Sequence, residues 1–191
     1  MKKLLALLLI LSSANFISAA DTLRVYTWDE ALAAEPSEVL AISLQKMKLD
    51  SIPHALTRFK NLKQLDVSKN KLTALPDFMD QFPQLEVLDL GKNKLSTFPV
   101  QICQLGNLRR LIVNRNFFGT LPECVQYLKK LEYIDFWDTP ISDLPEAFTL
   151  MPQLKKIDLS GIKFNPAFQK KWRERLPWVR IEFDAPCDCM K

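Results

Sequence analysis

The chain has 191 residues, with 12 prolines, only four glycines and a formal net charge of +4 at pH 7. This length and composition suit one folded domain and argue against a disordered or low-complexity chain. The charge is too close to neutral to imply sequence-independent binding of nucleic acid, so we expect no nucleic-acid partner.

Residues 1–20 have the layout of a secretory signal peptide. Lys2 and Lys3 precede the apolar stretch 4–11, and small residues follow at 18–20. The apolar stretch is well short of the roughly 20 residues that a membrane span needs. We predict cleavage at the end of this segment, which gives a secreted or periplasmic protein with no membrane span in the mature chain. The loss of two basic side chains leaves 24 basic and 22 acidic ones, a net charge of +2.

Residues 21–38 are predicted to form an N-terminal cap. Thr27 and Glu30 have the spacing of a capping box at the start of a helix. A terminal repeat has a neighbour on one side only, so its exposed core needs a cover. The apolar residues expected to provide that cover are Trp28, Ala31 and Leu32.

A 23-residue repeat occupies residues 39–164. One unit reads LKQLDVSKNKLTALPDFMDQFPQ from Leu62, and an earlier copy starts at Val39. A fixed period in the twenties is the signature of a solenoid, and we count six units. The leucines that mark the first position at this spacing are Leu62, Leu85, Leu108, Leu131 and Leu154.

Each position of the unit has an expected role. Leu62, Leu65 and Val67 predict a strand with its alternate side chains facing the core. The ninth position is expected to turn inward and satisfy backbone groups at the turn; it holds Asn70, Asn93 and Asn116. The fifteenth position suits the entry to a helical return segment; it holds Pro53, Pro76, Pro99, Pro122 and Pro145.

The pattern LxxLxLxxNxLxxLPxxΦxxLxx, with Φ apolar, resembles the leucine-rich repeat in its 23-residue LPxxI subtype. The resemblance covers roughly Val39 to Pro177, and the flanking segments look like those of short secreted bacterial members of the family. It implies an α/β fold, a curved right-handed solenoid. The concave face would carry a parallel β-sheet, and the convex face short helices or 3₁₀ turns.

Residues 165–183 are predicted to form a C-terminal cap. Asn165 and Pro166 read as the N-cap and first residue of a helix. One face of that helix would carry Phe168, Trp172 and Leu176, and a final strand would carry Val179, Ile181 and Phe183. Residues 184–191 form a tail with Cys187 and Cys189. With Cys103 and Cys124 these make four cysteines, which allow three disulfide pairings, and the sequence does not choose among them.

The outward positions of the strands and turns form the candidate binding surface. The third, fifth, seventh, eighth and tenth positions are expected to point into the concave groove. Over the first repeats the fifth position is mostly aspartate, and the eighth and tenth are mostly lysine. Such rows are expected to compensate one another at the surface at little net energy, so a solvated surface is the simpler interpretation.

The fourth and fifth units depart from this pattern together. Aromatic and β-branched residues replace charges beside arginine, which is the composition of an interface hot spot. The alternative is that Tyr133 and Trp137 pack on each other or under a loop. The predicted partner-binding residues are Arg110, Ile112, Asn114, Arg115, Phe117, Tyr133, Asp135 and Trp137.

These features favour a non-catalytic binding module for a protein or peptide ligand, with no cofactor and no metal. His54 is the only histidine and lies in a turn, and the chain has no nucleophile motif or phosphate-binding loop. Two alternatives stay open. Aromatic rings with aspartates would suit carbohydrate at the cell surface, and Cys187 with Cys189 would suit a thiol or redox protein.

Overall fold

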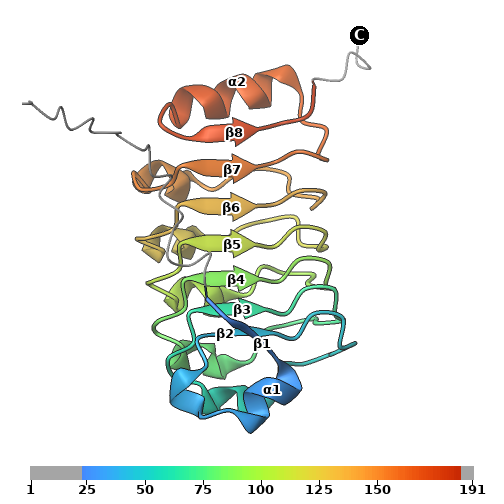
Figure 1. The fold of residues 1–191 in the computed structure, drawn as a ribbon. Helices are drawn as coiled ribbons and strands as arrows, with labels where there is room; N and C mark the ends of the chain where they lie inside the picture. Colours follow the sequence, from blue (N-terminus) through green and yellow to red (C-terminus); the bar gives the residue numbers. More distant parts are fainter. Residues whose placement is uncertain (1–22, 186–191) are drawn as a thin grey trace, which may run out of the picture.

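The computed structural model describes residues 23–185. Their strands form a single parallel sheet in which the order in space is the order in the sequence (Figure 1). The predicted repeat architecture is therefore confirmed. The strands are β1 (Val25–Thr27), β2 (Ala41–Ser43), β3 (Gln64–Asp66), β4 (Val87–Asp89), β5 (Arg110–Ile112), β6 (Tyr133–Asp135), β7 (Lys156–Asp158) and β8 (Arg180–Glu182).

The 23-residue period fixes the register of this sheet. Asp66 pairs with Asp89, Asp89 with Ile112, and Ile112 with Asp135, so equivalent positions of successive units lie side by side. A shift by one residue would turn every core side chain outward, because side chains alternate along a strand. The register therefore lines up the outward positions in columns along the stack.

Short 3₁₀ helices return the chain behind the sheet. They are η2 (Pro36–Glu38), η3 (His54–Arg58), η4 (Asp77–Gln81), η5 (Val100–Gln104), η6 (Glu123–Tyr127) and η7 (Glu146–Leu150). The prolines of the fifteenth position lie at the N-cap, one residue before each turn, rather than inside it. For example, the Pro53 carbonyl accepts from the Leu56 N–H at 3.0 Å. Between sheet and turns lies a continuous apolar core.

The asparagine of the ninth position satisfies backbone groups at the turn, as predicted, and it also links neighbouring units. The Asn70 Nδ2 donates to the carbonyls of Leu44 and Val67, each at 2.9 Å, and its Oδ1 accepts from the Leu49 N–H at 3.0 Å. The same bonds recur at Asn93 and Asn116. Each amide thus satisfies buried backbone groups that the turn would otherwise leave unpaired.

The N-terminal cap differs in part from expectation. The capping box of α1 (Trp28–Ala33) is present between Thr27 and Glu30, and Ala31 is buried. Leu32 is exposed, so its predicted role in covering the core was wrong. The strand β1 was not predicted; it pairs with β2 and extends the sheet beyond the first repeat.

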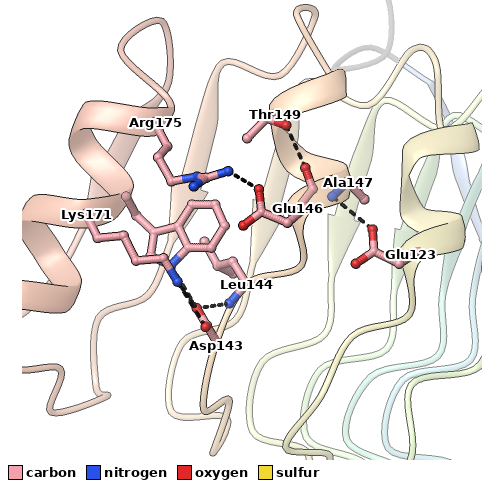
Figure 2. Close-up of polar contacts among 9 residues, drawn as sticks. Glu123, Asp143, Leu144, Glu146, Ala147, Thr149, Lys171 and Arg175 are labelled. Carbon is pink, nitrogen blue, oxygen red and sulfur yellow. Dashed lines mark hydrogen bonds and ion pairs between the residues drawn. The ribbon is translucent and has the colours of Figure 1, made fainter.

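The helix α2 (Pro166–Arg175) closes the other end of the core. Asn165 caps it by accepting from the Phe168 N–H, and Trp172 is fully buried. Figure 2 shows how the helix is tied to the last return segment. Lys171 pairs with Asp143, Arg175 pairs with Glu146, and the Trp172 indole N–H donates to Asp143 Oδ1 at 2.9 Å.

Two further links join the stacked units. A disulfide joins Cys103 and Cys124 on adjacent return segments, with the Cα atoms 5.7 Å apart. At the start of the strands, second-position side chains of alternating sign form a chain of ion pairs: Lys63, Glu86, Arg109, Glu132 and Lys155. Single surface pairs contribute little to stability, but a network of them can help to hold adjacent units together.

The predicted signal peptide and the tail residues Cys187 and Cys189 lie outside the described residues. Within residues 23–185, no helix has the length and apolar character of a membrane span.

Candidate functional site

The candidate site lies where β5 and β6 and their turns meet on the outward face of the sheet. Arg110 pairs in register with Tyr133, and Ile112 pairs with Asp135. The next outward positions hold Asn114 and Trp137. The structure therefore brings the predicted residues of the fourth and fifth units into one contiguous surface.

Tyr133 lies between two cations. The Arg110 guanidinium is 4.6 Å from the ring centre, and the Lys156 Nζ of the next strand is 5.4 Å from it. Burial, and then the negative charge of Asp135, raise the pKa of the Tyr133 hydroxyl to about 12. The hydroxyl therefore stays protonated at neutral pH and is available as a hydrogen-bond donor.

Trp137 is held by a second arginine. The Arg115 guanidinium lies 4.2 Å from the centre of the Trp137 rings, and Arg115 Nε donates to Asp138 Oδ2 at 3.1 Å. Both aromatic residues are half-buried, and each is stacked against an arginine rather than against the other ring. The alternative in which the two rings pack on each other is therefore not what the structure shows.

Asp135 organises the centre of the site. One of its oxygens accepts from the Asn114 amide at 2.6 Å, and the other accepts from the Trp137 backbone N–H at 2.8 Å. Burial raises its pKa above the ordinary value, although these two bonds oppose the shift. Gly91 leaves room for this arrangement, because a Cβ there would be 2.5 Å from Asn114 Oδ1.

The aspartate side chains of the fifth position accept hydrogen bonds from backbone N–H groups, and among the described residues they do not form ion pairs with the lysines. The N–H groups of Ser68 and Gly91 donate to Asp66 and Asp89, each at 2.8 Å. Within residues 23–185 no ion pair joins the aspartate row to the lysines of the eighth and tenth positions. The expected compensation between the two rows is therefore not realised by direct pairs.

Comparison with known proteins agrees with the repeat and the fold. The profile of the leucine rich repeat family matches residues 37–95 and 60–118. The chain is a leucine-rich repeat protein. Such proteins generally bind other proteins on the extended surface of the solenoid, and they are generally not enzymes. No match was found among curated proteins.

Two solved structures show the same architecture. A leucine-rich repeat protein of Leptospira interrogans is 28% identical, with a TM-score of 0.66 over 76% of this chain and 37% of that one. An internalin from Listeria monocytogenes is 17% identical, with a TM-score of 0.60 over 76% of this chain and 44% of that one. The present chain thus spans less than half the length of either protein, and the second likeness concerns the fold alone.

Phe117 is also among the predicted site residues, and it borders a hollow in the surface of this leucine-rich repeat protein. Its side chain is 65% exposed. The hollow has a volume of about 560 Å³ and is lined by Arg115, Phe117, Pro140, Ile162 and Lys163, among others. The exposed ring and the hollow together offer an apolar contact surface at the edge of the candidate site.

A series of backbone hydrogen bonds between successive units is interrupted next to this hollow. The N–H groups of Lys71, Lys94 and Phe117 each donate to the eleventh-position carbonyl of the preceding unit. Pro140 has no N–H to continue the series. Thr139, at the asparagine position, donates to the Val113 carbonyl at 3.3 Å, but among the described residues no side chain accepts from the Phe118 N–H.

Sequence reasoning missed three contributors to the site. Lys156 occupies the third position, like Arg110 and Tyr133, so the repeat alignment alone could have placed it beside Tyr133. The roles of Asp138, as partner of Arg115, and of Gly91, as the space beside Asn114, depend on side-chain geometry. The 23-residue period does place Asp138 beside Arg115 and Gly91 beside Asn114, so the alignment could have marked them as neighbours but not their contacts.

Proposed function

We propose that this leucine-rich repeat protein is a non-catalytic extracytoplasmic module that binds a protein or peptide partner in the concave groove. The binding residues are those of the fourth and fifth units: Arg110, Ile112, Asn114, Arg115, Phe117, Tyr133, Asp135 and Trp137. One observation carries the proposal. Two arginine–aromatic stacks join the fourth and fifth units, one on the paired strands β5 and β6 and one on the turns that follow them, with both rings partly open to solvent.

Arginine and aromatic residues are enriched among the few residues that dominate binding energy at interfaces. Here the stacks and the bonds of Asp135 hold the side chains in place before a partner arrives. A partner then loses less free energy in ordering them. The exposed guanidinium edges still offer donors for carbonyl or carboxylate groups of the partner.

Two features support an extracytoplasmic location. The first 20 residues have the layout of a signal peptide. The disulfide between Cys103 and Cys124 belongs to a class of bond that persists mainly in oxidising compartments.

Affinity capture with paired variants tests the proposal. The mature protein is immobilised and exposed to envelope and medium proteins of the native host. We expect Tyr133→Ala/Trp137→Ala to lose the captured partner. Tyr127→Ala/Trp178→Ala, which removes two exposed aromatic residues outside the site, should retain it.

Circular dichroism and thermal unfolding establish that both variants keep the fold. Equal capture by the site variant and the wild type would refute the site. Glycan-array binding without any protein partner would favour the carbohydrate alternative instead.

A further inference from the structure

A double row of unpaired lysines runs along the turn side of the first three units. All six side chains are exposed, and none lies within ion-pair distance of a carboxylate of residues 23–185. We call this surface the lysine rim. It consists of Lys46, Lys69 and Lys92 at the eighth position and Lys48, Lys71 and Lys94 at the tenth.

The backbone fixes the spacing of the lysine rim. Lys46, Lys69 and Lys92 have φ between 57° and 62°, so the eighth position has the same backbone conformation in all three units, although in the first unit Lys48 also has a φ of 60°. Neighbouring strands of a sheet lie about 4.8 Å apart, which brings the lysines of successive units close together within each column, and neither column has an acidic residue in these three units. Such charges repel one another, and an anionic ligand would relieve that repulsion.

The lysine rim leads directly to the hollow beside Phe117. Along the tenth position three lysines are followed by Phe117 and Pro140, and then by Lys163. The hollow lies in the second half of this column. A ligand that follows the column therefore meets cations first and an apolar surface next.

We propose that this edge binds an extended acidic segment of a partner protein. Its carboxylates would contact the lysine rim, and one large apolar side chain would enter the hollow beside Phe117. The inference rests on the proposed protein-binding function and specifies the chemistry of the partner. An acidic polysaccharide would satisfy the charges but would have no apolar side chain for the hollow, so a polypeptide fits better.

The length of the segment follows from the geometry. From the first to the sixth unit the column spans roughly 25 Å at about 4.8 Å per strand. An extended chain advances about 3.3 Å per residue, so about eight residues cover it. A labelled peptide of about eight residues is therefore a suitable probe, with glutamates in the middle and a phenylalanine at each end to allow either orientation.

Fluorescence anisotropy of this peptide at low ionic strength tests the proposal. We expect saturable binding that weakens on the order of tenfold in Lys71→Glu/Lys94→Glu, because attraction becomes repulsion. Lys129→Glu/Lys130→Glu makes the same change of charge before β6 and should bind like the wild type. Replacing both phenylalanines of the peptide by alanine should also weaken binding.

Three results would overturn the inference. The first is that the peptide shows no saturable binding. The second is that Lys71→Glu/Lys94→Glu and Lys129→Glu/Lys130→Glu lose peptide affinity equally. The third is that heparin, an acidic polysaccharide, binds while the peptide does not. Circular dichroism of each variant separates these results from misfolding. Failure of the proposed function is distinguishable, because host-partner capture that depends on Tyr133 and Trp137 would persist even if the lysine rim bound nothing.

Discussion

The Arg115 guanidinium stacks on Trp137 at 4.2 Å from the ring centre while its Nε donates to Asp138. Arg115 has a φ of 50°, in the left-handed region where residues with a Cβ are strained. The two contacts thus fix the long Arg115 side chain on a backbone conformation that is unfavourable for a residue with a Cβ. They also define which face of the indole a partner can reach.

Loss of this stack should lower stability as well as binding. Arg115→Gln removes the cation and its pair with Asp138, and we expect the free energy of unfolding to fall by about 1 kcal/mol. Lys92→Gln is the matched control, because Lys92 occupies the same position with a φ of 57° and has no ion pair. Urea unfolding measures both. A loss of similar size in the control would mean that the stack contributes nothing.

Gly161 should tolerate no side chain. Its φ is +77°, and a Cβ there would lie 2.9 Å from the Asp138 backbone N and 3.1 Å from Trp137 Nε1. We expect Gly161→Ala to destabilise the fold by about 2 kcal/mol through strain and crowding. Gly106→Ala is the comparison, because nothing lies within 4 Å of its added Cβ. Thermal unfolding should separate the two variants, and identical melting temperatures would contradict this account.

Asp89 should make stability depend on pH. Burial raises its pKa from 3.8 to about 6, although the bond from the Gly91 N–H opposes the shift. The folded state therefore holds this proton more tightly than the unfolded state. The protonated Asp89 therefore contributes to the free energy of unfolding. This contribution is fully present below the pKa of the unfolded state and is lost as the pH rises through about 6.

Asp89→Asn keeps an acceptor for the Gly91 N–H but cannot ionise. We expect the variant to be more stable than the wild type at pH 7 by about 1–2 kcal/mol, and the two to converge below pH 4. Glu30, Glu132 and Asp143 have lowered pKa values and act in the opposite direction in both proteins. The informative quantity is therefore the difference between the two unfolding curves across pH. A constant difference would contradict the assignment.

Much of the fold was accessible from the sequence, because the repeat encodes the register. The spacing of Leu62 and Leu85 sets which strands pair, and the asparagines of the ninth position, such as Asn70, mark the turns of three units. The capping box at Thr27 and the N-cap at Asn165 were local signals that the structure confirms. The strand β1 escaped prediction because it lies ahead of the first repeat and so occupies no repeat position.

The candidate site was only partly predictable from the sequence. A departure from the repeat shows where a site lies, but it does not show how its side chains contact one another. Ile112 and Trp137 stood out against their equivalents in the other units. Their neighbours then followed from the register. The stacking of Arg115 on one particular ring depends on rotamers, and the pairing of Cys103 with Cys124 depends on the shape of the return segments. Neither is encoded in the spacing of the sequence.

The disulfide should be a substantial source of stability. Cys103 and Cys124 are 21 residues apart, and closing a loop of this size in the unfolded chain corresponds to about 3 kcal/mol. Cys103→Ala/Cys124→Ala should therefore unfold at lower urea concentration than the oxidised wild type. Reduction of the wild type with dithiothreitol should give a similar loss. An unchanged midpoint after complete reduction would show that the bond contributes nothing.

Thr139 is where the ladder of asparagines between units ends, and restoring it should stabilise the protein. An asparagine there would keep the donor to the Val113 carbonyl and add an acceptor for the Phe118 N–H, as Asn116 provides for Leu95 at 3.1 Å. We expect Thr139→Asn to raise the free energy of unfolding by about 1 kcal/mol. The reciprocal change, Asn116→Thr, should lower it by about 1–3 kcal/mol, because it leaves a buried N–H unpaired. Urea unfolding of both variants tests the pair, and a loss in both would show that the fifth unit prefers threonine for its own packing.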